Sequence, residues 1–388
     1  MILQPTWKTL NRQTIYSAHL KGSAEAILSK LWETCDMCGI AGYVGTIPVD
    51  QNRVESCLEL MGRRGPDAVA HSMIDLPNGA TAQLLHSRLS VIDLDERSNQ
   101  PFSTEASIIS INGEIYNYLE LAEELRAQGM DFATVSDTEV ASRLMEQQSL
   151  SALSQMEAMF ALAWIDRRDG TVVLARDRFG EKPLLYMRAS HGLFFGSEVQ
   201  YLAELSGSTL EIDSTQIVRY LVNGYKDLFK RKGTFFSNVE RVAPGTGLIC
   251  KPEGNWEDFS FAKWDSVTVD QTLTFEEAVQ GTRERITRAV ELRLRSDVPV
   301  ALCLSGGIDS NLILGVARNI LGADVQPFSI VGSDSRYDES DAIQKSAEWF
   351  GVSPICKNMR GINLLDEIEE ITRFRGAPIA TANQFALW

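Results

Sequence analysis

The sequence predicts two consecutive domains, an α+β domain and then an α/β domain built on a parallel sheet. From residue 38 onward, short apolar strands alternate with turns, and residues 119–128 and 137–148 have the apolar spacing of helices laid on a sheet. After residue 275, apolar strands and helical segments follow one another in strand-helix-strand-helix order, which is typical of a parallel sheet. A chain of 388 residues is long enough to bury a core in each domain.

The expected elements set the domain boundaries. In the first domain we expect strands at residues 39–44, 82–85, 107–111, 161–165, 171–175 and 192–195, and then a hairpin at 234–250. In the second we expect helices at 275–294, 308–320 and 338–350 and strands at 298–304 and 325–331. A loose stretch containing Trp256 and Trp264 lies between them. The expected division is a leader at 1–37, domains at 38–250 and 275–388, and a linker at 251–274.

The composition excludes several classes of protein. With 44% apolar and 23% charged residues and no apolar run near ~18 residues, the chain has the composition of a globular protein without a membrane span. Its net charge of −15 argues against a general attraction to nucleic acid or anionic membranes, so small polar molecules are the expected ligands. Six dispersed cysteines and no signal peptide indicate the cytoplasm. The oligomeric state is left open, a homodimer included.

Cys38 is the strongest candidate for chemistry because it directly follows an internal methionine, Met37. If the active chain began at Cys38, its α-amino group, with a pKa near ~7.7 to 8.0, could take the proton of the thiol, whose pKa is near ~8.5. The four histidines are not spaced as metal ligands, so neither a zinc site nor a Cys-His pair is expected. The alternative interpretation of Cys38 is a small buried hydrophobe.

Residues 1–36 contain no pattern that we connect with chemistry. A cysteine that works through its own α-amino group requires residues 1–37 to be absent from the active protein. We favour translation starting at Met37. The other two interpretations are removal of a propeptide and a retained extension that disables the site.

A series of motifs extends over the first domain. They are MCGIAGYVG at 37–45, RRGPDA at 63–68, RLSVID at 88–93, NGEIYNY at 112–118, SDTE at 136–139, RDRFGEKPLLY at 176–186 and FGSEVQYL at 195–202. Together they resemble the class II glutamine amidotransferases, and most closely the glutaminase half of the asparagine synthetase B family. The resemblance implies an Ntn-hydrolase αββα fold, with Cys38 attacking the side-chain amide of glutamine to release ammonia.

The same resemblance implies roles for five further residues. Asn112 and the backbone N–H of Gly113 would stabilise the tetrahedral oxyanion. Arg88 would bind the α-carboxylate of glutamine with its planar guanidinium, and Glu114 and Asp137 would receive the α-ammonium. Taken singly, an Asn-Gly turn and solvated charged residues would explain these positions equally well.

The segment LSGGIDS at 304–310 stands where an apolar strand is expected to turn into a helix. Glycines let successive N–H groups converge on phosphate oxygens, and a helix N-terminus adds partial positive charge, so the segment predicts an anion site. It lacks the GxxxxGK[ST] pattern of a Walker loop. A plain strand-to-helix turn is the alternative interpretation.

SGGIDS resembles the pyrophosphate loop of the ATP pyrophosphatases, the adenylating half of asparagine synthetases, and so implies binding of ATP and Mg²⁺. The resemblance places seven residues at ATP: Leu304, Ser305, Gly306, Gly307, Asp309, Ser310 and Ile330. Leu304 and Ile330 would flank the adenine, while Asp309 would offer a carboxylate oxygen to Mg²⁺.

Both halves together imply a glutamine-dependent ligase that adenylates the β-carboxylate of aspartate and yields asparagine, AMP and pyrophosphate. Departures from the family pattern leave the acceptor open. The chain ends at Trp388, before an expected GEGxDE-like motif, so we expect a partial synthetase domain. Residues 376–378 read GAP where an acidic triplet is usual, and YDES at 337–340 resembles relatives that amidate other carboxylates. The alternatives are an amidotransferase for a sugar acid or secondary metabolite, and a glutaminase-only or inactive fragment.

Overall fold

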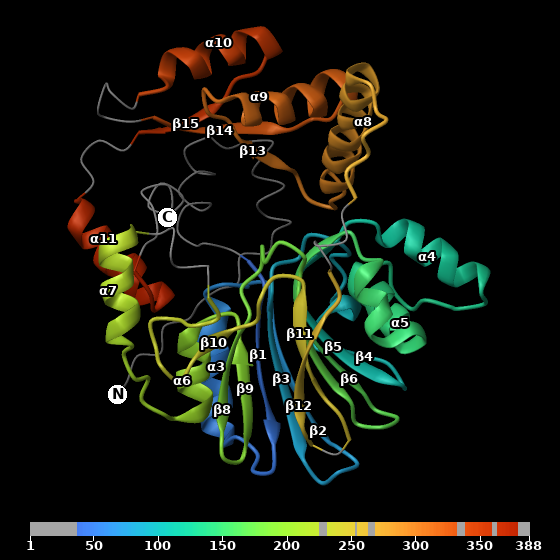
Figure 1. Cartoon of the computed structure of the whole chain (residues 1–388), viewed down its shortest axis with the longest axis vertical. Helices are drawn as coiled ribbons and strands as arrows, with labels where there is room; N and C mark the ends of the chain where they lie inside the picture. Colours follow the sequence, from blue (N-terminus) through green and yellow to red (C-terminus); the bar gives the residue numbers. More distant parts are fainter. Residues whose placement is uncertain are drawn as a thin grey trace, which may run out of the picture.

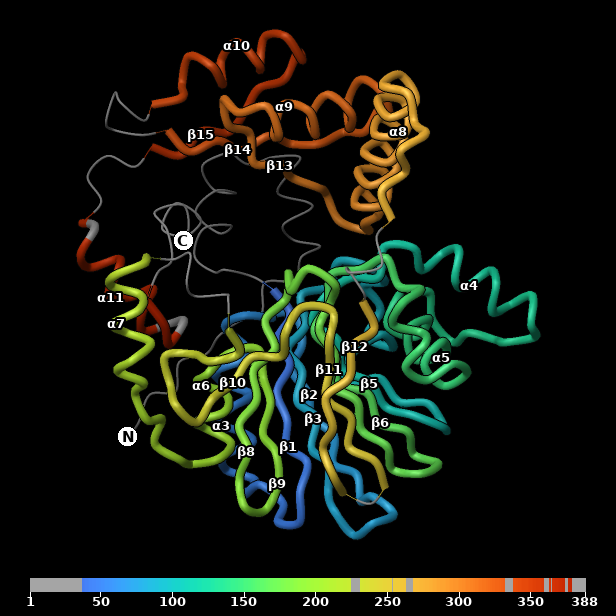
Figure 2. Tube along the Cα trace, viewed as in Figure 1, coloured from blue at the N-terminus to red at the C-terminus, as the bar shows by residue number. Residues whose placement is uncertain are grey.

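The computed structural model describes residues 37–224, 231–252, 254–262, 268–331, 338–358 and 363–378. The expected leader up to residue 36, together with Trp264 and Tyr337, lies outside these ranges. The described residues form a sheet-rich part and a smaller part with a three-stranded sheet and helices (Figure 1). Figure 2 follows the chain from blue to red and shows that the two parts succeed one another along the sequence.

Two six-stranded antiparallel sheets form the centre of the first domain. The first has the order β10-β8-β9-β1-β3-β2, with β1 (Gly39–Gly45), β2 (Ala68–Asp75), β3 (Thr81–Arg88), β8 (Leu185–Ala189), β9 (Gly192–Gly196) and β10 (Glu240–Arg241). The second has the order β12-β11-β7-β6-β5-β4, with β4 (Phe102–Ser103), β5 (Ser107–Ile115), β6 (Ala158–Asp166), β7 (Val172–Arg176), β11 (Thr246–Cys250) and β12 (Trp256–Ser260).

Apolar side chains from the facing surfaces of the two sheets fill the space between them. Ile40 and Leu84 of the first sheet and Ile108 and Leu174 of the second are fully buried in one cluster. Each such side chain contributes about 1.5–3 kcal/mol by leaving water. Every residue of β1 is buried, so the strand that follows Cys38 is held rigidly in the interior.

Helices cover the outer face of each sheet and complete four layers (Figure 1). On the first sheet, α3 (Gln51–Gly62) and α6 (Val199–Ser206) bury Met61 and Leu202. On the second, α4 (Tyr118–Ala127) and α5 (Asp137–Gln148) bury Leu125 and Leu144. Three further elements are η1 (Glu96–Ser98), η2 (Ser149–Ser154) and α7 (Ser214–Asn223). The αββα layers confirm the expected fold class of this domain.

The second domain contains a parallel sheet in the order β13-β14-β15, formed by β13 (Ala301–Cys303), β14 (Gln326–Val331) and β15 (Ile355–Asn358). Its helices are α8 (Phe275–Arg293), α9 (Ile308–Gly315), the π-helical turn η4 (Val316–Ile320), α10 (Ser340–Phe350) and α11 (Leu364–Arg375). A capping box at Thr274 and Glu277 starts α8. The parallel pairing confirms the α/β class.

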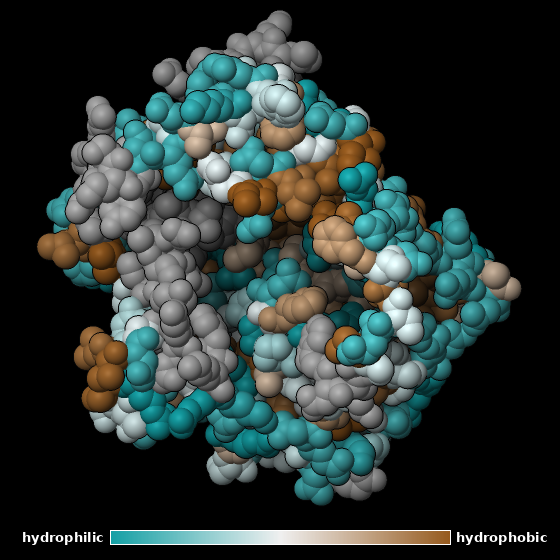
Figure 3. All heavy atoms as spheres, turned by 45° about the horizontal axis from the view of Figure 1, so that its top comes forward, coloured by the Kyte–Doolittle hydropathy of each residue, from teal (hydrophilic) through white to brown (hydrophobic). Residues whose placement is uncertain are grey.

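Several apolar side chains of the second domain are exposed, and Figure 3 shows apolar surface in its region. They include Ile308, Leu312, Ile313, Ile320 and Trp349. No helix within the described ranges is long and apolar enough to cross a membrane.

The structure adds elements that the sequence pattern does not predict. α3, α6 and α7 are absent from the expected elements, as are β2, β8 and β15. The strand β12 (Trp256–Ser260) lies inside the segment 251–274 that we expected to be a linker, and it pairs along its whole length with β11. Three of its five residues are exposed and none is fully buried, and such an exposed edge strand carries a weak hydrophobic signal. We therefore propose that the first domain extends to Ser260.

The start of the second domain contacts the first through polar groups. The contacts are the ion pairs Arg288–Glu157 (2.7 Å) and Arg295–Glu120 (2.6 Å) and the hydrogen bond from Asp93 N to Asp297 Oδ2 (2.7 Å). The two ion pairs are partly exposed, and each is therefore worth only about 0.2–1 kcal/mol.

Candidate active site around Cys38

Cys38 lies at the entrance to β1 and is half-buried. Its Sγ accepts a hydrogen bond from Leu89 N (3.3 Å) and donates one to Leu89 O (3.4 Å). Burial raises the pKa of the thiol to about 11, although the Leu89 bond and the nearby cations of Lys182 and Arg88 act in the opposite direction. While Met37 is attached to it, Cys38 therefore keeps its thiol proton at neutral pH and needs a base to become a nucleophile.

Arg64 fixes the backbone of the candidate nucleophile. Its Nε donates to Cys38 O (2.6 Å), and its backbone carbonyl accepts from Met37 N (2.6 Å). Nη1 forms a largely buried ion pair with Glu198 (2.8 Å). Removing one partner of such a pair would leave a buried charge, at a cost of about 3–5 kcal/mol. The pair therefore locks the position of Cys38 from the side of α6.

Asn112 and Gly113 lie side by side in β5. Asn112 is fully buried, and its Nδ2 donates to Ser197 Oγ (3.3 Å). Gly113 has φ +151°, and a Cβ added there would lie 1.9 Å from the backbone oxygen of Met159 in β6. Because the neighbouring strand is fixed by the sheet, only glycine fits at this position.

Arg88 ends β3, and the loop that follows it holds its guanidinium. Nη1 donates to Asp95 O (3.1 Å) and Asn99 Oδ1 (2.9 Å), and Nη2 donates to Ile92 O (3.2 Å) and to Asp93 O. These bonds leave the side chain a single orientation. Asp93 itself has a left-handed backbone with φ +53°, a conformation that aspartate tolerates better than most residues.

Glu114 and Asp137 form an acidic pair near Arg88. Asp137 is buried at the first turn of α5, where its Oδ2 accepts a hydrogen bond from Ile115 N (2.8 Å). Burial raises the pKa of Asp137 to about 6. Burial and then the charge of Asp137 raise the pKa of Glu114 well above its usual value. A cation bound beside these two carboxyl groups would be favourable, because it would compensate their buried charge.

No role was assigned from the sequence to three residues that contact Cys38, Asn112 or one another: Arg64, Ser197 and Glu198. They lie within RRGPDA and FGSEVQYL, so the motifs that carry the resemblance contained them. Their function could not be assigned because each acts on a partner far along the chain: Ser197 is 85 positions from Asn112, and Glu198 is 134 positions from Arg64.

The segment 304–310 has the local geometry of an anion-binding loop. It links β13 to α9, and hydroxyl groups order its turn: Ser305 N and Gly307 N donate to Ser310 Oγ (3.1 Å) and Ser305 Oγ (3.3 Å). Gly306 N donates to the carboxylate of Glu339 (2.9 Å). The loop thus presents an N–H group to a negatively charged oxygen.

The remaining predicted ATP residues flank this loop. Leu304 is buried, with its carbonyl accepting from Ser329 Oγ (2.8 Å), and Ile330 is half-buried in β14, the strand beside β13. Asp309 is exposed on the first turn of α9. Within the described residues no group of three His, Cys, Asp or Glu side chains could hold a metal ion. Phosphate and water oxygens would have to complete the coordination of a Mg²⁺ held by Asp309.

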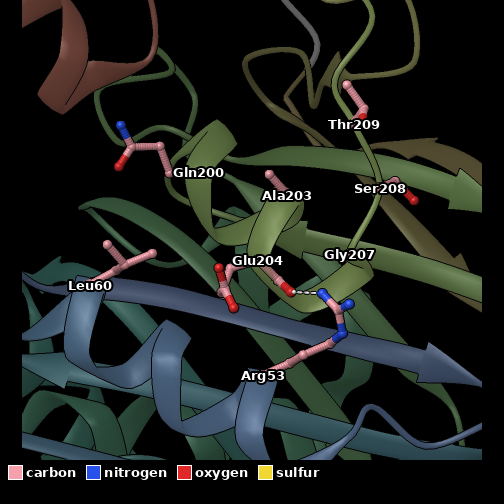
Figure 4. Close-up of a pocket in the computed structure, with 8 residues that line it drawn as sticks. All are labelled: Arg53, Leu60, Gln200, Ala203, Glu204, Gly207, Ser208 and Thr209. Carbon is pink, nitrogen blue, oxygen red and sulfur yellow. Dashed lines mark hydrogen bonds between the residues drawn. The ribbon is translucent and has the colours of Figure 1, made fainter.

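A hollow of about 450 Å³ lies elsewhere, between α3 and α6 (Figure 4). Figure 4 shows Arg53 of α3 reaching the carbonyl oxygen of Glu204, at 3.1 Å, across this hollow. Its lining residues include none of the predicted site residues. We therefore do not connect it with the chemistry of Cys38.

Two family profiles match successive parts of the chain. The profile described as "Glutamine amidotransferase domain" matches residues 37–260. The chain belongs to this glutamine amidotransferase family. A second profile, "Asparagine synthase", matches residues 281–388, which include the loop at 304–310.

The curated relatives of this chain have two kinds of name. "Asparagine synthetase [glutamine-hydrolyzing] 1" of Bacillus subtilis is 31% identical over 89% of this chain and 54% of its own length. "Amidase chyE" of Penicillium rubens is 33% identical over 86% of this chain and 50% of its own length. The chain thus spans about half the length of these relatives. The solved glutamine PRPP amidotransferase of B. subtilis aligns with 90% of this chain and 92% of its own at 14% identity and a TM-score of 0.44.

Proposed function

We propose that this protein carries the glutaminase site and the nucleotide loop of a glutamine-dependent asparagine synthetase. The observation that supports this most strongly is the convergence of Cys38, Arg88 and the Glu114–Asp137 pair, whose charges act on one another. A thiol, a fixed guanidinium and two acidic groups are the partners that the amide, the α-carboxylate and the α-ammonium of glutamine require.

In the first half-reaction Cys38 Sγ attacks the amide carbon of glutamine. The base is the α-amino group of Cys38, freed by the absence of residues 1–37. The Gly113 N–H and the Asn112 amide would stabilise the oxyanion, and such a donor contributes about 10²–10³ in kcat. Ammonia leaves, and water hydrolyses the thioester to glutamate.

In the second half-reaction we assign ATP to the loop at 304–310, with Leu304 and Ile330 beside the adenine. The N–H groups of the loop would bind the pyrophosphate part of ATP. Mg²⁺, with Asp309 among its ligands, would neutralise phosphate charge. The acid is adenylated with release of pyrophosphate, and ammonia displaces AMP to form the amide.

Aspartate is the acceptor that we propose, because several relatives are named asparagine synthetases. A second candidate is another carboxylic acid, and the two relatives named amidases favour it. We place the protein in the cytoplasm, a location compatible with the free thiols of Cys38, Cys57, Cys250, Cys303 and Cys356.

The test is glutamate release from glutamine by the purified chain in full length and by the version that starts at Met37, with the N-terminal residue of each identified by mass spectrometry. We expect activity only where Cys38 is the first residue, and none after Cys38→Ala. Full activity with residues 1–37 still attached would refute the proposed base. Adding ATP with aspartate or with other carboxylic acids, and measuring AMP, then separates the two acceptors.

A further inference from the structure

Ser197 is a buried residue of the FGSEVQYL motif that none of the roles above uses. It directly follows β9, and its N–H donates to Ile40 O (2.8 Å). Its Oγ accepts from Ile40 N (3.1 Å) and from Asn112 Nδ2 (3.3 Å). One hydroxyl group therefore connects the strand that begins beside Cys38 with the side chain proposed to stabilise the oxyanion.

Among the described residues, the hydroxyl of Ser197 accepts hydrogen bonds but donates none. Ser197 Oγ receives two donors, while its own proton meets no acceptor within the described ranges. Asn112 Oδ1 is buried and likewise has no partner there. A buried polar atom left without a partner costs about 1–3 kcal/mol. Turning the Asn112 amide by half a rotation pairs both groups, because the Ser197 O–H then donates to Oδ1.

We propose that Ser197 is a positioning residue that orients the amide of Asn112 for catalysis. This inference rests on the proposed glutaminase function. In the turned orientation Ser197 O–H holds Asn112 Oδ1, and Nδ2 is released as a donor for the oxyanion that forms when the Cys38 sulfur adds to the substrate carbonyl. Without the hydroxyl, nothing at this position distinguishes the oxygen from the nitrogen of the amide.

The surrounding contacts explain why Ser197 can impose an orientation. Its backbone N–H and its Oγ both bond to Ile40, so the hydroxyl is fixed relative to β1. The next residue, Glu198, holds Arg64, which in turn bonds to Cys38 O. Through residues 197–198, Asn112 and the backbone of Cys38 are therefore both hydrogen-bonded, directly or through Arg64, to the same short segment of backbone.

The test compares Ser197→Ala, Asn112→Ala and the double variant, each in the version of the chain that hydrolyses glutamine. In Ser197→Ala we expect kcat to fall about 10-fold with KM changed less than about 2-fold, because the bond that is weakened, from Asn112 Nδ2 to the oxyanion, forms only in the transition state. In the Asn112→Ala background the same substitution should cost less than about 2-fold, because Ser197 acts through Asn112. An equal loss in both backgrounds would overturn the proposal.

A second readout uses inhibitors. Glutamate γ-semialdehyde accepts the Cys38 thiol across its C=O bond: a C–S bond forms, the C–O π bond breaks and the thiol proton goes to the oxygen. We expect its inhibition constant to rise about 10-fold in Ser197→Ala, in parallel with kcat, while that of glutamate stays unchanged. Equal weakening of both inhibitors would instead indicate a general distortion of the site and would contradict the proposal.

Ser110→Ala is the matched control. Ser110 is a fully buried serine of β5, two positions before Asn112, and unlike Ser197 its Oγ has no partner within the described residues. This variant should retain the parent kcat and inhibition constants, and thermal unfolding shows whether each variant is folded. If the parent hydrolyses no glutamine in either version, the proposed function fails. If the parent is active and Ser197→Ala matches it, only the role of Ser197 fails.

Discussion

Asp137→Asn should stabilise the ligand-free protein while weakening its binding of glutamine. Burial raises the folded pKa of Asp137 from 3.8 to about 6. A shift of about 2 units corresponds to roughly 3 kcal/mol. Because the folded pKa of Asp137 lies above its unfolded value, the contribution of this group to stability is fully present below about pH 4 and is lost as the pH rises through about 6. Above that pH Asp137 is ionised in the folded protein, and the burial of its charge lowers the free energy of unfolding by the full amount.

The substitution removes this charge and keeps an oxygen that can accept the bond from Ile115 N. At about pH 8 we expect Asp137→Asn to raise the free energy of unfolding of the first domain by roughly 1–3 kcal/mol, the lower figure allowing for weaker hydrogen bonds to an uncharged acceptor. Near pH 4 the gain should shrink below about 1 kcal/mol, because Asp137 of the folded parent is then mostly protonated and carries no more charge than the asparagine of the variant. The charge of Asp137 also raises the pKa of Glu114, so its removal relieves that group as well.

Urea unfolding at the two pH values measures the gain, and the KM of glutaminase activity measures the loss. We expect KM for glutamine to rise at least about 10-fold, because the α-ammonium loses a buried charge partner. Glu120→Gln is a control of opposite sign, since the hydrogen bond from Arg295 lowers the pKa of Glu120 to about 2. Stability from that pair is present above about pH 4.5 and lost toward pH 2, so the control should lose stability at pH 8. A stability change in Asp137→Asn that is the same at both pH values would refute the reasoning.

Three further predictions concern the nucleophile, the oxyanion site and the contact between domains. While residues 1–37 are attached, the rate of Cys38 alkylation by iodoacetamide should keep rising up to about pH 11, because burial raises the pKa of the thiol. In a chain that begins at Cys38, alkylation should occur at a lower pH. Mass spectrometry measures the alkylated fraction in both cases. Gly113→Ala should abolish glutamate release, because its Cβ would lie 1.9 Å from a backbone oxygen. Replacing both Arg288 and Arg295 by alanine should lower stability by no more than about 2 kcal/mol, since the two pairs are partly exposed, and should increase the radius of gyration measured by X-ray scattering.

Local patterns predicted the fold classes well and the outline of the site in part. The strands of the first domain were predictable because buried strands such as β1 and β6 are continuous apolar runs. β12 and α3 were not, because each exposes much of its surface and its apolar residues are few. The roles of the site residues, from Cys38 to Asp309, remain proposals.

The amino-acid sequence by itself determined the order of the two domains, the glycine at 113 and the candidate nucleophile, because strand periodicity, turn residues and motifs are properties of neighbouring positions. Only the tertiary structure decided which groups face one another. The link from Ser197 to Asn112 spans 85 positions and the pair Arg64–Glu198 spans 134. The raised pKa of Asp137 likewise follows from burial between elements that are distant along the chain. Pairing and desolvation depend on the packing of whole layers, which no local pattern encodes.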